Sequence, residues 1–385
     1  MKRMLCAFLA ILCCTAGIIC AMQSLSAAET VNLHLDATSA VLMEAETGKI
    51  LYEQNADEQL PPASITKIMT LLLVMEAIDA GKIKLTDTVT ASERAASMGG
   101  SQIFLKVGEQ MCVEDLLKSV VIASANDAAA ALAEHLCGSI ETFVERMNAR
   151  AAELGLKNTH FENTNGLDDT TTAHYTSARD VAIMSRALID HPLILTYSSI
   201  WMDTIRDGAF GLTNTNRLVR FYPGATGLKT GSTAKAKFCI SATAERDGMH
   251  LIAVIMGSPT RDIRNEEAKK LLDYGFANFA LFHGEEEDLG ELAVLGGTAD
   301  LCRVRQKEFC ALTDKGLAGK ITKKISLPPS LTAPIENGQK IGTVSYYAND
   351  TLIGECDIVA TESIGKISLW DIFFRILKNC FAVSR

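Results

Sequence analysis

Residues 61–79 read PPASITKIMTLLLVMEAID, and this stretch decides the fold. Apolar residues recur with a helical period and little charge, which predicts a buried helix from Ser64 to Asp79. Ser64 and Lys67 would then lie on one helix face, within reach of a hydrogen bond. A lysine that is desolvated near another cation is partly neutral near pH 7, so Lys67 could accept the Ser64 proton. The S-x-x-K pattern alone is common by chance and needs support.

Two further elements support a nucleophilic serine. Ser124-Ala125-Asn126 lies in a predicted break between helices, with a hydroxyl that could relay a proton and an amide that could hold a substrate carbonyl or orient the lysine. Lys229-Thr230-Gly231 lies at the start of a predicted edge strand, where it could bind an anionic substrate end at close approach. Singly, Ser124 would be a helix cap and Lys229 a surface charge. Their order and spacing make the set specific.

Strands are predicted at both ends of a helical middle. Residues 39–54 form a predicted hairpin closed by a glycine turn. Ser177 is the expected N-cap of one helix. The predicted helices cover residues 113–123, 128–135, 140–154, 177–190 and 265–279, and the later strands pass through residue 229 and cover 237–243 and 249–256. This order predicts an α+β fold in which a sheet built from distant segments lies beside a helical lobe.

The chain changes character after residue 280. Short strand-like pieces at 293–295, 321–325, 340–347 and 352–360 predict a small all-β domain over 281–365. Residues 366–385 follow as a predicted amphipathic helix with Trp370, phenylalanines and four basic residues against one acid. That composition is typical of an anchor at a membrane surface. The alternative is a helix that docks on its own protein.

The N-terminus resembles an export signal. Lys2 and Arg3 precede an apolar stretch from Leu5 to Met22, and small residues follow up to Ala28. This order predicts a signal peptide over 1–28, cleaved after Ala28, and leaves 29–280 as the main domain. An uncleaved membrane anchor is the alternative, and either would export the chain.

Composition excludes several classes of protein. Hydrophobic residues make up 48% and charged residues 22%, as in folded proteins. The net charge of −9 and the lack of a basic stripe do not support a nucleic-acid partner. No H-E-x-x-H motif or CxxC pair occurs, so neither a metal nor another cofactor is expected. The cysteines read as buried thiols, with a disulfide between Cys302 and Cys310, or between either and Cys356, as the alternative.

Taken together, S-x-x-K, S-x-N and K-T-G resemble the signature of penicillin-binding proteins and class A β-lactamases. The chain is most similar to the low-molecular-weight, D-alanyl-D-alanine carboxypeptidase branch, over about Val31 to Arg385. Further segments that carry the resemblance are MGGSQ (98–102), FENTNGL (161–167), HYTSARD (174–180), YPG (222–224) and GLKTG (227–231). The resemblance implies a transpeptidase-like domain, then the β domain and a membrane-binding helix.

Residue by residue, the resemblance implies a complete site. Ser64 would be the acyl-ester nucleophile, Lys67 the proton acceptor and Ser124 part of the proton network. The substrate would be bound by Asn126, Lys229, Thr230 and Gly231, and the oxyanion by the backbone N–H groups of Ser64 and Ser232. Residues 234–238 read AKAKF where many relatives have Gly-Tyr at the last two positions, which affects fine substrate preference.

The implied activity is hydrolysis of the terminal D-alanine from peptidoglycan stem peptides, outside the cell membrane, with β-lactam antibiotics as covalent inhibitors. Three alternatives remain: a serine β-lactamase of the same fold, an endopeptidase or transpeptidase that acts on cross-linked peptides, and a catalytically silent wall-binding module. A soluble lactamase would need neither the β domain nor the amphipathic tail.

Overall fold

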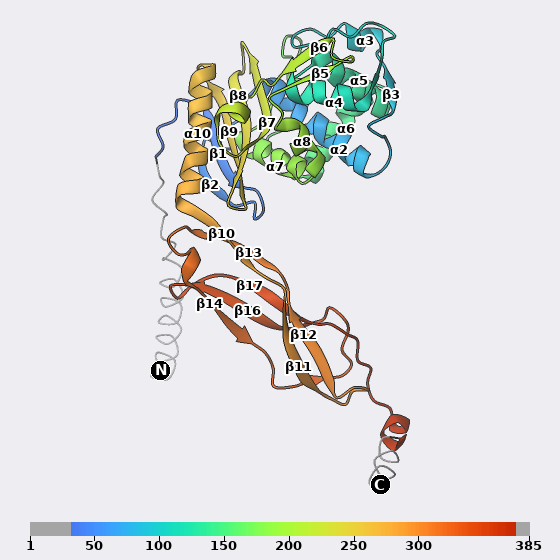
Figure 1. Ribbon diagram of the computed structural model, residues 1–385, viewed down its shortest axis with the longest axis vertical. Coiled ribbons are helices and arrows are strands. Elements are labelled where there is room, and N and C mark those ends of the chain that lie inside the picture. The colour runs from blue at the N-terminus through green and yellow to red at the C-terminus, as the bar shows by residue number, and fades with distance from the viewer. Residues whose placement is uncertain (1–31, 375–385) are drawn as a thin grey trace, which may run out of the picture. The chain divides into compact units, whose positions relative to one another are not determined.

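The computed structural model describes residues 32–374 of the chain (Figure 1). The predicted signal peptide and the end of the predicted C-terminal helix, from residue 375, lie outside the described residues.

The first domain is built on a five-stranded antiparallel sheet of order β2-β1-β9-β8-β7. Its strands are β1 (Ser39–Glu44), β2 (Ile50–Gln54), β7 (Ala225–Thr233), β8 (Lys237–Arg246) and β9 (Met249–Ser258). β1 pairs with β9 from Ser39 opposite Met256 to Glu44 opposite Leu251, so the N-terminal hairpin joins strands from two hundred residues further on. The prediction of a sheet assembled from distant segments is confirmed, and β7 lies at its edge.

Helices lie on both sides of this sheet (Figure 1). α10 (Arg261–Asn278) packs on β8 and β9, and α7 (Ala178–Ile189) packs on β1 and β9 from the helical lobe. The centre of the lobe is α2 (Lys67–Asp79), in which ten of thirteen residues are buried, as its apolar sequence predicts. Around it lie α3 (Glu93–Ala96), α4 (Val113–Ile122), α5 (Asn126–Cys137), α6 (Ile140–Glu153) and α8 (Pro192–Ser198).

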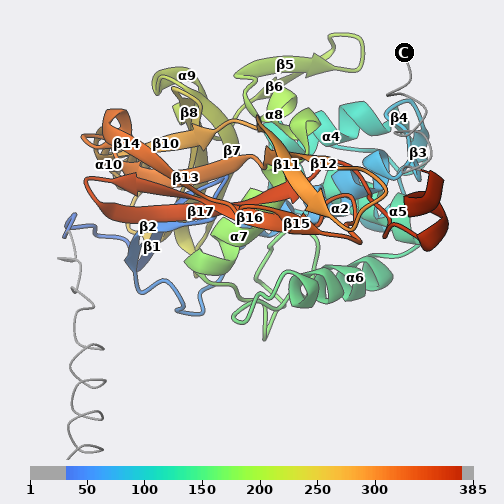
Figure 2. The same cartoon turned by 90° about the horizontal axis from the view of Figure 1, so that it is seen from below.

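Short elements that the sequence did not predict complete the domain. They are β3 (Thr88–Thr90) with β4 (Gln110–Cys112), the hairpin β5 (Met202–Ile205) and β6 (Phe210–Thr213), and α9 (Leu218–Phe221). Figure 2 shows β5, β6 and α9 on the same side of the domain.

Three helix starts differ from the predictions. Ser64 lies in the 3-10 turn η1 (Ala63–Thr66), and α2 begins at Lys67. α5 begins two residues early, at Asn126. α10 begins at Arg261, four residues early, because the Thr260 hydroxyl accepts the Ile263 N–H and caps it. The predicted cap at Ser177 is confirmed, since its hydroxyl accepts the Asp180 N–H.

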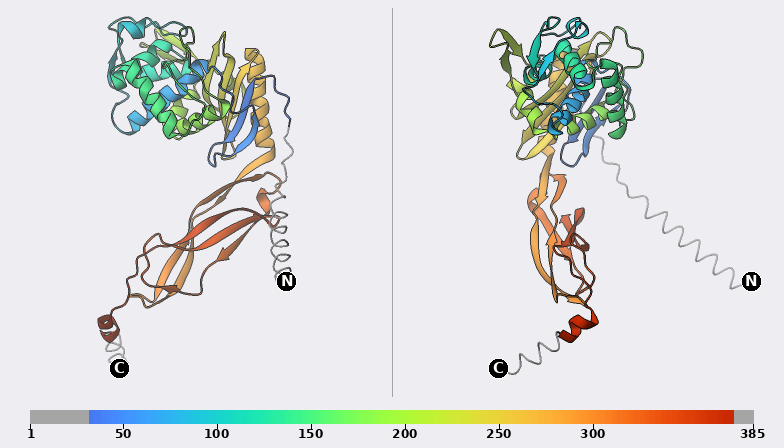
Figure 3. Two further views of the ribbon diagram at one scale, coloured as in Figure 1. Left: turned by 180° about the vertical axis from the view of Figure 1, so that it is seen from behind. Right: turned by 90° about the vertical axis from the view of Figure 1, so that its right-hand side faces the viewer.

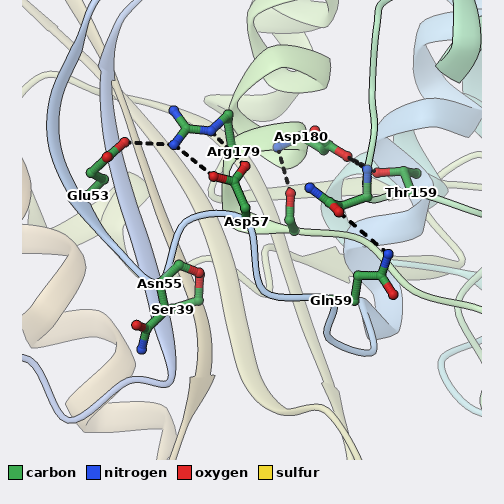
Figure 4. Close-up of polar contacts among 10 residues, drawn as sticks. Ser39, Glu53, Asn55, Asp57, Gln59, Thr159, Arg179 and Asp180 are labelled. Atoms are coloured by element: carbon green, nitrogen blue, oxygen red, sulfur yellow. Dashed lines mark hydrogen bonds and ion pairs between the residues drawn. The ribbon is translucent and has the colours of Figure 1, made fainter.

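Two charged side chains of α7 bind neighbouring segments: Arg179 binds the β2 region, and Asp180 binds the loop that follows α6 (Figure 4). Arg179 donates to Asp57 Oδ1 and to Glu53 Oε2, both at 2.8 Å. Asp180 accepts from the Asn158 backbone N–H and the Thr159 hydroxyl, also at 2.8 Å. These bonds tie the β2 region and the start of the loop to α7.

The second domain is all-β, as predicted. Figure 2 labels its strands β11, β12, β16 and β17, and Figure 3 shows the orange and red strands running along the domain. Its six-stranded sheet has the order β14-β16-β17-β12-β11-β15. The strands are β11 (Glu287–Leu295), β12 (Leu301–Gln306), β14 (Ile321–Ser326), β15 (Leu331–Thr332), β16 (Lys340–Ala348) and β17 (Thr351–Ala360), and β10 (Phe279–Gly284) pairs separately with β13 (Phe309–Asp314). Cys302, Cys310 and Cys356 are free thiols, so no disulfide joins them.

The described part of the C-terminal segment is short. Residues 369–374 are helical, and Leu369, Trp370, Phe373 and Phe374 are exposed. Among residues 32–374, no helix has the length and apolar character needed to cross a bilayer.

Candidate active site

The turn that carries Ser64 is packed against the loop of residues 161–176. Gly166 adopts a left-handed backbone conformation (φ 85°), and a Cβ there would lie 1.7 Å from the Ala63 carbonyl oxygen. Ala63 itself has a positive φ of 48°. Only glycine fits at position 166, so the backbone of this loop directly supports the turn that presents Ser64.

Lys67 lies at the centre of the site. Its Nζ is 2.9 Å from Ser64 Oγ, 2.5 Å from Asn126 Oδ1 and 2.9 Å from the Asn165 carbonyl oxygen. A neutral amine can donate its two protons to the two carbonyl oxygens. Its lone pair then faces Ser64 Oγ, the geometry that a proton acceptor requires.

Burial favours the neutral form of the Lys67 amine. Lys67 is fully buried, and this desolvation, followed by the charge of Lys229, lowers its pKa well below the ordinary value. Burial, followed by the charge of Arg264, lowers the pKa of Lys229 to about 7. The structure therefore has the buried lysine near a second cation that the sequence suggested.

Ser124 and Lys229 form the second polar pair of the site. Lys229 Nζ donates to Ser124 Oγ at 2.8 Å and to the Thr230 carbonyl oxygen at 3.1 Å. Ser124 has a positive φ of 62° between α4 and α5, and its hydroxyl does not cap α5. Lys229 is 1% exposed. Ser124 is thus no helix cap and Lys229 no surface charge.

The edge strand β7 runs directly past the nucleophile. A Cβ at Gly231 would lie 2.8 Å from the Ser64 backbone nitrogen and 3.0 Å from that of Ile65. The side chain of any other residue would press on the turn that holds Ser64. Thr230 Oγ1 donates to Thr215 Oγ1 at 2.8 Å, which fixes the hydroxyl on this strand.

The predicted site residues come together around one cleft. A cavity of ≈ 470 Å³ is lined by five of them: Ser64, Ser124, Thr230, Gly231 and Ser232. Lys67, Asn126 and Lys229 contact this set from the buried side. The Asn126 side chain is already engaged, since Nδ2 donates to the Gly99 carbonyl oxygen, so it orients Lys67.

The sequence did not predict a role for several residues of the site. The Asn165 carbonyl oxygen binds Lys67 but belongs to the backbone, so no side-chain pattern could reveal it. Ser101, from the segment MGGSQ, lines the cavity without having been assigned a role. The other lining residues come from segments without a motif: Trp201, Thr213, Asn214, Thr215, Arg217, Arg261 and Arg264.

His174 links the loop to the nucleophile turn. Its Nε2 lies 2.7 Å from Thr66 Oγ1, and its Nδ1 accepts the Glu162 N–H at 2.9 Å. Because Nδ1 is an acceptor, the proton of the neutral ring is on Nε2 and is donated to Thr66. Burial lowers the pKa of His174 to about 4, so the ring is neutral at pH 7.

Replacing this histidine should weaken the fold in a pH-dependent way. His174→Ala should lower the free energy of unfolding by about 2–3 kcal/mol at pH 7, because the Thr66 hydroxyl and the Glu162 N–H lose their partner. As pH falls from 6.5 to about 4, the unfolded chain binds a proton that folded His174 excludes. The free energy of unfolding of the wild type therefore falls by up to about 3 kcal/mol over this pH range, and that of the variant does not.

Urea unfolding at pH 7 and pH 4.5 measures both effects. His160→Ala is the matched control, since His160 is exposed just before the same loop, where its Nδ1 is hydrogen-bonded to the Ala173 carbonyl oxygen and its ring lies near that of Tyr175. A difference between wild type and His174→Ala that stays constant over this pH range would contradict the assignment.

Comparison with known proteins agrees with this geometry. Residues 24–260 match the family model described as D-alanyl-D-alanine carboxypeptidase. The chain belongs to the D-alanyl-D-alanine carboxypeptidase family. Residues 285–366 match the model of the penicillin-binding protein 5 C-terminal domain.

Individual members of this family cover most of the chain. D-alanyl-D-alanine carboxypeptidase DacF of Bacillus subtilis is 44% identical over 344 residues, 88% of each chain. The crystal structure of penicillin-binding protein 5 from Haemophilus influenzae is 35% identical with a TM-score of 0.78, and covers 87% of this chain and 99% of its own. Penicillin-binding protein D2 from Listeria monocytogenes in its ampicillin-bound form is 34% identical with a TM-score of 0.59, over 64% of this chain and 100% of its own.

Proposed function

We propose that this chain removes the terminal D-alanine from stem peptides of peptidoglycan through an acyl-enzyme on Ser64. The observation that carries the proposal is the contact of 2.9 Å between Ser64 Oγ and the fully buried Lys67 Nζ. Membership of the family and the names of its curated relatives support the same reaction.

The geometry supports a sequence of proton transfers. Ser64 Oγ attacks the carbonyl carbon of the penultimate D-alanine while Lys67 accepts its proton. The N–H groups of Ser64 and Ser232 would bind the oxyanion, and Ser124 would pass a proton to the leaving amine. Free D-alanine departs as the ester forms. Water then attacks the ester, with Lys67 again as base, and releases the shortened peptide.

The substrate's terminal carboxylate would bind at Thr230 and Lys229. Thr230 lines the cavity, and Lys229 lies behind it with its charge directed to Ser124. A β-lactam antibiotic carries a carboxylate and a strained amide in a similar arrangement. We therefore infer that penicillins acylate Ser64 as covalent inhibitors, consistent with the ampicillin-bound relative.

Release of D-alanine from a diacetylated tripeptide that ends in D-alanyl-D-alanine tests this function, with benzylpenicillin as inhibitor. We expect steady release that stops as penicillin accumulates on the protein. Fast turnover of penicillin without release of D-alanine would favour the β-lactamase. If neither release of D-alanine nor a penicillin adduct is observed, the result favours the silent wall-binding module.

We propose four segments for the whole chain. They are a signal peptide (1–28), the catalytic domain (29–280), the β domain (281–365) and an amphipathic helix (366–385) that binds the outer face of the cell membrane. The exposed apolar side chains of Leu369, Trp370 and Phe373 support the last assignment.

Removing the tail should release the enzyme from lipid. A protein comprising residues 29–365 should stay in the supernatant after sedimentation with anionic lipid vesicles, whereas 29–385 should sediment with them. The full-length variant with Leu369→Glu and Phe373→Glu serves as a matched control, and it should stay soluble too. Sedimentation of the truncated protein would contradict the anchor.

A further inference from the structure

The active-site cleft has a strongly cationic wall. Its lining includes three guanidinium groups, from Arg217, Arg261 and Arg264, and no carboxylate. The remaining lining residues are mostly hydroxyl-bearing or amide side chains. A cavity of ≈ 470 Å³ lies within the range of about 300–1,000 Å³ that is usual for ligand pockets. Such a cleft favours ligands with more than one negative charge.

The three arginines differ in their engagement. Arg264 is buried, and it donates to Asn265 Oδ1 and to the Cys239 carbonyl oxygen. Arg217 and Arg261 are exposed, and neither forms an ion pair within 4.0 Å with any described residue. Trp201 also lines the cavity, and its buried Nε1–H has no acceptor in the described part of the chain. The guanidinium groups of Arg217 and Arg261 therefore remain available to a ligand.

Of these two arginines, Arg217 is the one that follows closely on the residue bonded to Thr230. Thr215 is bonded to Thr230 and begins the short segment that leads to Arg217. In the proposed function, Thr230 marks the side on which the leaving D-alanine binds. The loop of residues 161–176 contributes no residue to this cavity. The cavity thus extends on the leaving-group side.

We propose that this side of the cleft binds an amine acceptor with a second carboxylate, and that Arg217 selects for it. The acyl-enzyme would then transfer its peptide to an acidic D-amino acid as well as to water. This inference rests on the proposed function, because it uses the same Ser64 ester and the same carboxylate site.

The chemistry is the reverse of acylation with a different amine. The acceptor's neutral amine attacks the ester carbonyl carbon, the new C–N bond forms and the bond to Ser64 Oγ breaks. The amine loses a proton to Lys67, and Ser64 Oγ regains one. The acceptor's α-carboxylate would lie at Thr230, where that of D-alanine lay. Its side-chain carboxylate would reach Arg217, since guanidinium and carboxylate groups match in shape and charge.

A competition between two acceptors of equal size tests the proposal. The protein is incubated with the diacetylated tripeptide donor and with equal concentrations of D-glutamate and D-glutamine, and mass spectrometry measures both exchange products. We expect wild type to form the D-glutamate product about tenfold faster, because a charged hydrogen bond is worth that much. In Arg217→Gln, the ratio should fall to about one.

Arg220→Gln is the matched control. Arg220 lies on α9, whose N-cap residue is Arg217; its guanidinium group lies over the rings of Trp201 and Phe221, and it does not line the cavity. It should keep the wild-type ratio.

The outcomes separate two failures. If D-alanine is released but wild type makes equal amounts of both exchange products, or none, the proposed acceptor site is wrong. The proposed carboxypeptidase activity is then still supported. A ratio that persists in Arg217→Gln would likewise overturn the role of Arg217. If neither D-alanine nor a penicillin adduct appears, the proposed function itself fails. The wild-type ratio does not depend on whether any variant folds.

Discussion

Ser64→Ala should form no penicilloyl adduct when the protein is incubated with benzylpenicillin and its intact mass is measured. The variant removes the only atom that the proposed reaction joins to the ligand, so the loss should be complete. Release of D-alanine should fall by several orders of magnitude, to the level that binding and oxyanion stabilisation alone support. Alanine is small enough for the half-buried position, so the fold should be unchanged.

Ser101→Ala is the control for this result. Ser101 also lines the cavity, but it contacts the site through its backbone carbonyl oxygen, which accepts the Asn126 N–H. That variant should still form the adduct. An adduct on Ser64→Ala of the same mass as on wild type would show that another residue is the nucleophile. Digestion and peptide mapping would then locate it.

Lys67→Arg should lower the rate of acylation by about 10²–10⁴, because arginine stays charged at all accessible pH values and cannot accept the proton. The buried space around Nζ suits an amine that meets Ser64 Oγ, Asn126 Oδ1 and the Asn165 carbonyl oxygen. Stopped-flow acylation measures the rate. Lys82→Arg, at an exposed position beyond the end of α2, should match wild type.

The pH dependence gives a second test of the same residue. Only neutral Lys67 is a base, so the acylation rate should rise with pH through its lowered pKa, far below the range of an ordinary lysine. Above a pH of about 7, Lys229 loses its charge and carboxylate binding should weaken, so the profile should be bell-shaped. Lys67→Arg should lose the rising limb. An unchanged profile in that variant would exclude Lys67 as the base.

Much of this site could be predicted because its chemistry resides in the side chains of three short sequence motifs. Ser64, Lys67, Ser124 and Lys229 each have a reactive group, and the structure joins them in two bonded pairs. The α+β architecture followed from apolar periodicity and from strands at both ends of the helical segment.

What the sequence could not predict depends on backbone and on long-range packing. The short turn η1 reads as part of α2 because both have the same apolar pattern. The Asn165 carbonyl oxygen and the close approach of Gly166 to Ala63 involve main-chain atoms. Arg217 and Arg264 both line the cleft, although they come from different segments with no shared motif. Only tertiary structure brings such groups together.

The burial of Lys67 has a consequence for the newly made chain. In an unfolded chain, water surrounds this amine and its pKa is that of any lysine, so Ser64 is an ordinary alcohol. Reactivity arises only when α5, β7 and the loop of residues 161–176 close around Nζ. Together with Lys67, those segments span more than one hundred and fifty residues of sequence. Ser64 therefore becomes reactive only in the folded protein, and an antibiotic should not acylate the chain before folding is complete.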